Sequence, residues 1–246
     1  MRAFLVQLAV LVSASCHASP TRCSSQAFDG RHFTVCVVDV ARETLRLFDA
    51  DEQGAAYGSF DRLRQALVAR GQSLAWAMNA GMYDEHGKPV GLYVEQGKLG
   101  KPASTRDGPG NFHMKPNGVF FVEAGKVAVR ETGAYLAKDH HPELATQSGP
   151  MLLADGSVHP SIMPTGTSRK LRNGVGVRDE HTAVFVISDE PVTFWELATL
   201  FRDSLGCKNA LFLDGTVASL YAPELHRKDE AFPLGPMFGV VTRAGP

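Results

Sequence analysis

A carboxylate directly follows an apolar run near the C-terminal end of the sequence. Residues 210–213 (ALFL) have the pattern of a buried strand, and Asp214-Gly215-Thr216 comes next. A carboxylate at a strand end can act as a base, a nucleophile or a substrate anchor, and the glycine lets a ligand approach the backbone. An ordinary Asp-Gly turn is the alternative. Asp214 is the candidate catalytic residue, with Gly215 as a candidate substrate contact.

Amide and hydroxyl side chains occur in two similar settings. Asn79 follows the apolar run 74–78 (LAWAM) and precedes Ala80-Gly81, and Gln147-Ser148-Gly149-Pro150 precedes a second apolar run. Such side chains can hold a sugar hydroxyl or a phosphate oxygen, although both segments also fit plain turns. Because Gln147–Pro150 is not a Gly-x-Ser-x-Gly elbow, Ser148 is predicted to bind substrate and not to act as a nucleophile.

Basic side chains suited to phosphate are grouped after residue 168, with two more upstream. They are Arg169, Lys170, Arg172, Arg178, His113 and Lys115. The planar guanidinium of arginine matches phosphate geometry. Arg172 is the best candidate because it directly precedes Asn173-Gly174-Val175-Gly176-Val177, whereas Arg169 and Lys170 equally fit a solvated loop.

The sequence predicts neither a metal site nor a cofactor site. His140-His141 and His113 lack the spacing of a zinc motif. Gly174-Val175-Gly176 is only a weak fragment of a nucleotide-binding loop.

The fold must position these residues. The order of strand-like and helix-like segments predicts an α+β or mixed α/β fold around a central mixed sheet. Residues 182–188 and 210–213 resemble strands, and the intervening helix begins with a Thr193–Glu196 capping box. A right-handed strand-helix-strand crossover with parallel strands follows from that order. Other predictions are a helix after Ser59, hairpins near 91–98 and 118–130, and long active-site loops at 100–117 and 131–174.

Composition places the chain among ordinary globular proteins. It has 246 residues, a net charge of -1, 44% hydrophobic and 21% charged residues. With 25 basic and 26 acidic side chains, no overall case for nucleic-acid binding exists. No segment is long and apolar enough to predict a membrane span. Oligomeric state is not indicated by the sequence.

The first 18 residues have the pattern of a signal peptide. Met1-Arg2 is followed by an apolar stretch at 3–12, small residues at 13–16 and a cleavage motif ending at Ala18. The prediction is an exported protein, periplasmic or secreted, with a single domain at 19–246. A lipoprotein signal acylated at Cys16 and an ordinary N-terminal helix are the alternatives.

Export would permit disulfide formation. Of the cysteines beyond residue 18, Cys23 and Cys36 can close a short loop, which leaves Cys207 as a buried thiol. Three buried free thiols are the alternative.

In their order along the chain, these segments resemble the phosphodiester glycosidase family, typified by N-acetylglucosamine-1-phosphodiester alpha-N-acetylglucosaminidase, and especially its exported bacterial branch. The similarity runs from about Phe33 to Val241. It rests on six segments: Asn79–Tyr83, Asn117–Val119, Gln147–Pro150, Arg172–Gly176, Glu196–Ala198 and Leu213–Gly215.

The resemblance implies a hydrolase that cleaves a sugar from a sugar-1-phosphodiester and releases a phosphomonoester. Its partner would be a phosphorylated glycan or other sugar phosphodiester. Asp214 would assist attack at the anomeric carbon, as base or nucleophile, while the remaining candidates would bind substrate. Those candidates are Asn79, Gly81, Lys115, Asn117, Gln147, Ser148, Arg172, Gly215 and Ser219.

One segment departs from the family pattern. Much of the family continues Asp-Gly with a further glycine and paired serines, whereas this chain has Thr216-Val217-Ala218-Ser219. A non-catalytic exported glycan-binding protein and a metal-dependent phosphodiesterase therefore remain alternatives.

Overall fold

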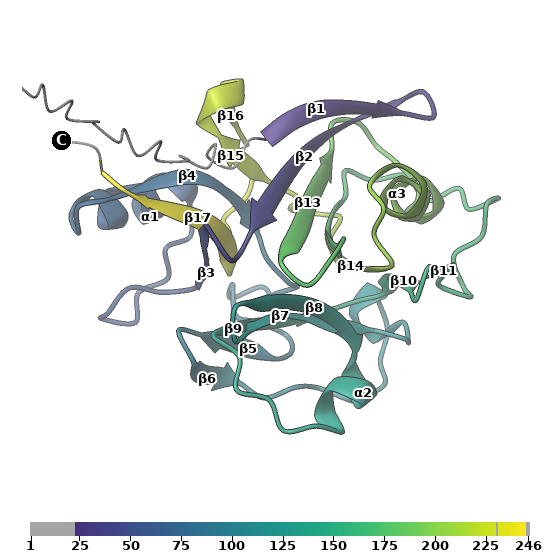
Figure 1. Cartoon of the computed structure of the whole chain (residues 1–246), viewed down its shortest axis with the longest axis horizontal. Coiled ribbons are helices and arrows are strands. Elements are labelled where there is room, and N and C mark those ends of the chain that lie inside the picture. Colours follow the sequence, from purple (N-terminus) through teal and green to yellow (C-terminus); the bar gives the residue numbers. More distant parts are fainter. Residues whose placement is uncertain (1–22, 230, 245–246) are drawn as a thin grey trace, which may run out of the picture.

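The computed structural model describes residues 23–229 and 231–244, and in this part of the chain the fold is mostly β. Strands account for 43% and helices for 14%. The strands form three sheets, called A, B and C, and every strand pairing is antiparallel (Figure 1). The predicted signal peptide, residues 1–18, lies outside the described residues.

Sheet A has seven strands in the order β1-β2-β13-β12-β14-β10-β11. Their bounds are β1 Cys23–Phe28, β2 Arg31–Asp39, β10 Met151–Ala154, β11 Ser157–Val158, β12 Asn173–Val177, β13 Thr182–Ser188 and β14 Asn209–Asp214. Helix α3 (Phe194–Thr199) continues into a π-helical turn at Leu200–Ser204, and both pack against the outer face of this sheet.

Sheet B has five strands in the order β16-β15-β4-β17-β3. Their bounds are β3 Thr44–Phe48, β4 Gln72–Asn79, β15 Leu220–Ala222, β16 Arg227–Lys228 and β17 Met237–Arg243. Helix α1 (Phe60–Val68) covers one face of it with Phe60, Leu63 and Leu67. A short 3-10 turn, Pro223–Leu225, joins β15 to β16.

Sheet C has five strands in the order β6-β5-β9-β7-β8. Their bounds are β5 Tyr93–Glu95, β6 Lys98–Lys101, β7 Gly118–Glu123, β8 Lys126–Glu131 and β9 Leu144–Ser148. A 3-10 turn at Asn111–His113 precedes β7, and helix α2 (Thr132–Leu136) packs against β7 and β8.

The three sheets meet in a shared aromatic core. Phe185 of sheet A, Trp76 and Phe238 of sheet B, and Phe120 of sheet C are each at most 1% exposed. The Phe185 ring centroid lies 5.0 Å from Trp76 and 5.0 Å from Phe238, and 5.7 Å from Phe120. Edge-on aromatic contacts at this spacing add to the stabilisation from burial, so this cluster fixes the relative positions of the sheets.

The local helix signals are confirmed. Ser59 Oγ accepts a hydrogen bond from Arg62 N at the start of α1. At α3, Thr193 Oγ1 accepts from Glu196 N while a Glu196 carboxylate oxygen accepts from Thr193 N, which completes the capping box.

The prediction of an α/β fold built on a strand-helix-strand crossover is wrong. β13 and β14 do not pair with each other, because β12 lies between them and runs antiparallel to both. The segment 173–177 (NGVGV) is a strand that the sequence did not predict, because two glycines interrupt its apolar pattern. Both glycines are required by close packing against neighbouring residues. A Cβ on Gly174 would lie 2.9 Å from Leu211 O, and one on Gly176 would lie 2.7 Å from Phe201 Cδ1. The predicted loop at 131–174 likewise contains β9, β10 and β11.

Cys23 and Cys36 lie opposite each other in the β1–β2 pairing and form a disulfide. Cys207 is a buried free thiol, and burial raises its pKa to about 12. The thiol of Cys207 is therefore protonated and unreactive at neutral pH.

Replacing both Cys23 and Cys36 by serine is expected to lower the free energy of unfolding by about 3 kcal/mol, because the disulfide restricts a short loop in the unfolded chain. Urea denaturation would measure the loss, and the reduced wild-type chain should reproduce it. Equal midpoints for the oxidised wild type and the double variant would contradict this expectation.

Candidate functional site

Four polar residues from sheets A and B meet where β4, β12 and β14 lie close together. Asn173 Nδ2 donates to Asn79 Oδ1 at 2.8 Å and to Asn79 O at 3.1 Å. Asn173 Oδ1 accepts from Asp214 N at 2.8 Å, and Asn79 Oδ1 also accepts from Ser219 N at 2.9 Å. Asn79, Asn173 and Ser219 are at most 1% exposed, so the two asparagine side chains fix the position of the Asp214 backbone.

The carboxylate of Asp214 is held by the turn that follows it. Asp214 Oδ1 accepts hydrogen bonds from Gly215 N at 2.6 Å, Thr216 N at 2.6 Å and Val217 N at 3.1 Å. No described residue donates a hydrogen bond to Oδ2. One carboxylate oxygen therefore orients the group, and the other is left for a ligand.

Asp214 lines a cleft of about 670 Å³. Gly215 and Thr216 form part of its wall, and Tyr83 and the half-exposed Phe232 contribute aromatic surface. Burial, together with the nearby charge of Asp214, raises the pKa of Tyr83. The Tyr83 hydroxyl is therefore a neutral hydrogen-bonding group at physiological pH.

Arg172 lies directly behind this turn and is almost completely buried, with 2% exposure. Its Nε donates to Val192 O at 2.9 Å and its Nη2 to Ser168 O at 3.0 Å. The guanidinium carbon lies 3.8 Å from the centroid of the Phe194 ring. A Cβ on Gly215 would lie 3.4 Å from Arg172 Nη1, so the absence of a side chain at 215 leaves the guanidinium next to the cleft wall.

The positive charge of Arg172 has no carboxylate partner among the described residues. Burial lowers its pKa to about 10, so the side chain is still cationic at neutral pH. A buried cation without a counterion is costly. The arrangement therefore places uncompensated positive charge next to the Asp214 cleft, where it would stabilise a bound anion.

Three of the predicted substrate contacts instead hold loops of the protein. Gln147 accepts hydrogen bonds from Leu92 N and Ser104 N with its amide oxygen and donates to Ser104 O. Asn117 Nδ2 donates to Phe112 O at 2.8 Å. Lys115 Nζ is 2.6 Å from Asp107 Oδ1, and Lys115 is not among the residues that line the Asp214 cleft.

Two more predicted contacts are buried between strands. Ser148 Oγ donates to Leu213 O at 3.0 Å and so joins β9 to β14 just before Asp214. A Cβ on Gly81 would lie 2.6 Å from Gln147 O, so Gly81 allows close packing against β9. Both residues support the site from behind.

Asn173 is the site residue that the sequence predictions missed as an individual candidate. Replacing it by alanine is expected to lower the free energy of unfolding by about 2 kcal/mol, because buried groups of Asn79 and Asp214 lose their partner. It should also lower any turnover that depends on the position of Asp214.

Chemical denaturation of Asn173→Ala would test this, with Asn209→Ala as the matched control. Asn209 is an asparagine on β14, the strand that carries Asp214, and it accepts one hydrogen bond, from Asp155 N, away from the cleft. A loss in Asn173→Ala no larger than in the control would contradict the central role of Asn173.

The comparison with known families matches the part of the chain that builds this site. The profile of the phosphodiester glycosidase family covers residues 72–241, which is more than half of the sequence. The chain belongs to the phosphodiester glycosidase family. The matched range contains every residue of the candidate site, from Asn79 to Ser219.

A curated protein and several solved structures are similar to this chain over most of its length. An uncharacterized Escherichia coli protein, YigE, is 32% identical over 217 residues, which cover 88% of this chain and 82% of YigE. Among solved structures, the catalytic domain of zebrafish N-acetylglucosamine-1-phosphodiester alpha-N-acetylglucosaminidase, auto-inhibited by its pro-peptide, superposes with a TM-score of 0.60. It is 15% identical, and the match covers 89% of this chain and 81% of that one.

A hypothetical protein from Synechocystis superposes with a TM-score of 0.53 and 15% identity, over 92% of this chain and 64% of that one. At these identities the two structures establish a shared fold.

No helix within 23–229 and 231–244 is long and apolar enough to cross a membrane. Over the same residues, no group of three or more His, Cys, Asp or Glu side chains is arranged to hold a metal ion.

Proposed function

We propose that this phosphodiester glycosidase family member is an exported hydrolase that cleaves a sugar from a sugar-1-phosphodiester and releases the free sugar and a phosphomonoester. The observation that carries the proposal is the buried, unpaired Arg172 behind the Asp214 turn. This combination supplies one reactive carboxylate in the cleft and positive charge directly behind the cleft wall at Gly215, where it favours a bound phosphate.

The chemistry requires little else from the protein. Water, activated by Asp214, attacks the anomeric carbon, or the carboxylate attacks first and water then hydrolyses the glycosyl ester. In either route the bond between the anomeric carbon and the bridging oxygen breaks, and the phosphomonoester leaves with that oxygen. Because phosphate is a good leaving group, stabilising its negative charge matters more than protonating it. One carboxylate can then replace the pair that ordinary glycosidases use.

The protein groups take distinct parts in this scheme. Asp214 Oδ2 is the reactive atom, since Oδ1 is already bonded to three backbone N–H groups. Asn79 and Asn173 fix the strand end that carries it. The ring of Phe232 at the cleft wall offers an apolar surface to a sugar face.

The decisive experiment uses the purified mature chain and a panel of sugar-1-phosphodiesters in water enriched in heavy oxygen, with and without a chelator. Mass spectrometry identifies the products. The expected result is labelled free sugar and unlabelled phosphomonoester in both conditions. Label in the phosphate together with chelator sensitivity would instead establish a metal-dependent phosphodiesterase.

A non-catalytic glycan-binding role makes a different prediction. It requires saturable glycan binding and no product with any member of the panel. Export is tested separately, by fractionating expressing cells and sequencing the N-terminus of the mature chain, where a start just after Ala18 is expected.

A further inference from the structure

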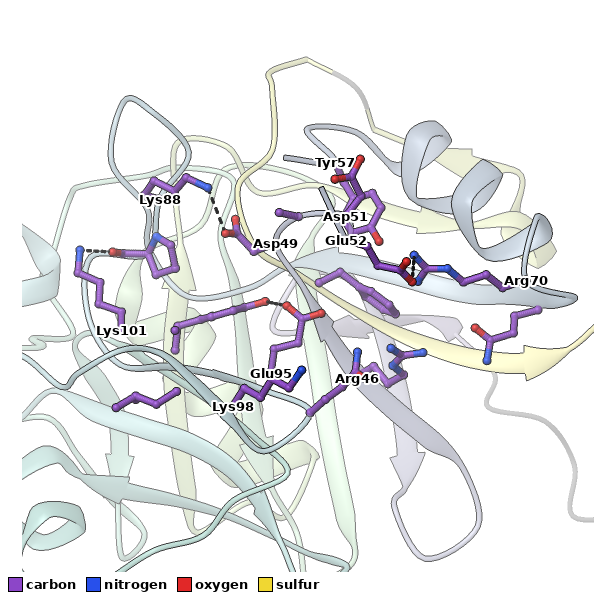
Figure 2. Close-up of a pocket in the computed structure, with 18 residues that line it drawn as sticks. Arg46, Asp49, Asp51, Glu52, Tyr57, Arg70, Lys88, Glu95, Lys98 and Lys101 are labelled. Carbon is purple, nitrogen blue, oxygen red and sulfur yellow. Dashed lines mark hydrogen bonds and ion pairs between the residues drawn. The ribbon is translucent and has the colours of Figure 1, made fainter. Parts of the chain in front are cut away.

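A second cavity, of about 970 Å³, shares no lining residue with the Asp214 cleft. It lies between β3, the segment 49–57 and the β5–β6 hairpin (Figure 2). It is larger than the Asp214 cleft, and nothing in the proposed hydrolysis uses it.

The floor of this cavity is aromatic. Phe48, Tyr57 and Tyr93 line it and are at most 5% exposed. The guanidinium carbon of Arg46 lies 5.0 Å from the centroid of the Phe48 ring. Stacking on a fixed ring restricts the arginine side chain, so its donors are already oriented for a ligand.

A half-buried carboxylate occupies the middle of the cavity. Glu95 accepts a hydrogen bond of 2.6 Å from the Tyr93 hydroxyl. Burial raises the pKa of Glu95, against the opposing effects of hydrogen bonds from the Tyr93 hydroxyl and the Asp49 backbone and of the charge of Arg46. The negative charge of Asp49 makes the smallest contribution and raises the pKa. A raised pKa in the folded state means that stability falls as pH rises through that pKa. The ionised Glu95 therefore destabilises the fold at neutral pH.

Two ion pairs lie among the other charged groups of the cavity wall, which also include Asp51, Lys98 and Lys101. Lys88 Nζ is 3.3 Å from Asp49 Oδ2, and Arg70 Nη2 is 3.1 Å from Glu52 Oε1. Acidic and basic side chains thus line the same hollow, as Figure 2 shows. A simple anion or cation would meet like charges here. A ligand with many hydroxyl groups, which both donate and accept hydrogen bonds, suits this mixed lining.

The cavity and the Asp214 cleft are separated by one tight turn. Tyr83 and Pro89 pair across the turn, and Lys88 N donates to Asp84 Oδ1 at 2.9 Å. Pro89 lines the cavity, whereas Tyr83 and Val90 line the cleft. Neighbouring residues of this one turn therefore contribute to both hollows.

We propose that the cavity binds neutral saccharide units of the glycan substrate that lie beyond the sugar released at Asp214, with Glu95 and Arg46 as hydrogen-bonding partners of the hydroxyls. The assignment of these units to the substrate rests on the proposed function. The existence of the saccharide site itself does not depend on the proposed function.

Glu95→Gln is the informative variant because glutamine preserves the acceptor for Tyr93 while it removes the buried charge. The variant is expected to unfold at a higher temperature than wild type at neutral pH. The difference should disappear below the ordinary pKa of glutamate, where Glu95 is protonated in both the folded and the unfolded chain. The same variant should bind saccharide about tenfold more weakly, because a charge-assisted hydrogen bond is lost.

Calorimetric titration with neutral trisaccharides of glucose, galactose, mannose or N-acetylglucosamine measures that binding, with inorganic phosphate as a separate arm. Glu180→Gln is the matched control, since Glu180 is exposed and pairs with Lys126 away from both hollows. Saccharide binding that is weakened in Glu95→Gln and unchanged in Glu180→Gln supports the site.

Two results would overturn the inference: no trisaccharide binds the wild-type chain, or binding is equal in wild type and Glu95→Gln. These outcomes are independent of turnover. Released sugar without trisaccharide binding removes the second site alone, and trisaccharide binding without released sugar removes the hydrolase proposal alone.

Discussion

Asp214→Asn is expected to lower turnover of a sugar-1-phosphodiester about 10³-fold and to leave the fold intact. The asparagine oxygen can still accept the backbone hydrogen bonds from Gly215, Thr216 and Val217 that Oδ1 accepts now. The turn therefore survives, while the negative charge and basicity of the carboxylate are lost. Steady-state kinetics and thermal unfolding of the same preparation measure both consequences.

Asp179→Asn is the matched control. Asp179 Oδ1 also accepts backbone hydrogen bonds within its own turn, from His181 N and Thr182 N, and it lies outside the Asp214 cleft. Turnover by the control should equal that of wild type. Near wild-type turnover by Asp214→Asn would remove Asp214 from the chemistry, and unfolding of that variant would show that the carboxylate has a structural role instead.

Arg172→Met is expected to lower turnover about 10²-fold, because the variant loses the positive charge that would stabilise the departing phosphate. We expect inorganic phosphate to stabilise the wild-type chain against thermal unfolding, and Arg172→Met should abolish that stabilisation. A ligand that binds only the folded state raises the unfolding temperature, and the uncompensated charge of Arg172 is the feature that would attract phosphate here.

Thermal unfolding in phosphate and in chloride of equal ionic strength separates this effect from general salt screening. Arg178→Met is the matched control, because Arg178 Nε also donates to a backbone carbonyl, that of Leu205. Arg172 Nη1, and no atom of Arg178, is among the atoms nearest a Cβ placed on Gly215 of the Asp214 turn. Arg178→Met should retain the phosphate response. An undiminished response in Arg172→Met would show that phosphate binds elsewhere.

The fold prediction failed where strand character depended on distant neighbours. The segment Asn173–Val177 lacks a continuous apolar pattern because Phe201, Cys207 and Leu211 occupy the space that side chains at 174 and 176 would need. Nothing within residues 173–177 indicates that distant residues fill the space beside these two glycines. The sequence predicted a central mixed sheet with parallel strands at 182–188 and 210–213. Sheet A is instead antiparallel throughout, with β12 between β13 and β14.

The site prediction shows the same division between local and distant information. Residue type and position alone indicated Asp214, Asn79 and Arg172 as candidates. Gln147 and Asn117 have equally suitable side chains, yet both are buried and already bonded to loop backbone groups and to the Thr132 hydroxyl. A side chain can bind a ligand only with the capacity that the fold leaves unused.

The family, the helix caps and the apolar strands could be predicted from the sequence, because each depends on residues a few positions apart or on the order of motifs. The order of the strands, the role of Asn173 and the burial of Arg172 without a counterion depend on tertiary contacts. Asn173 contacts Asn79 across 94 residues of sequence, and Ser219 contacts Asn79 across 140. Hydrogen bonds over such separations depend on how the sheets pack against one another, which no local pattern in the sequence specifies.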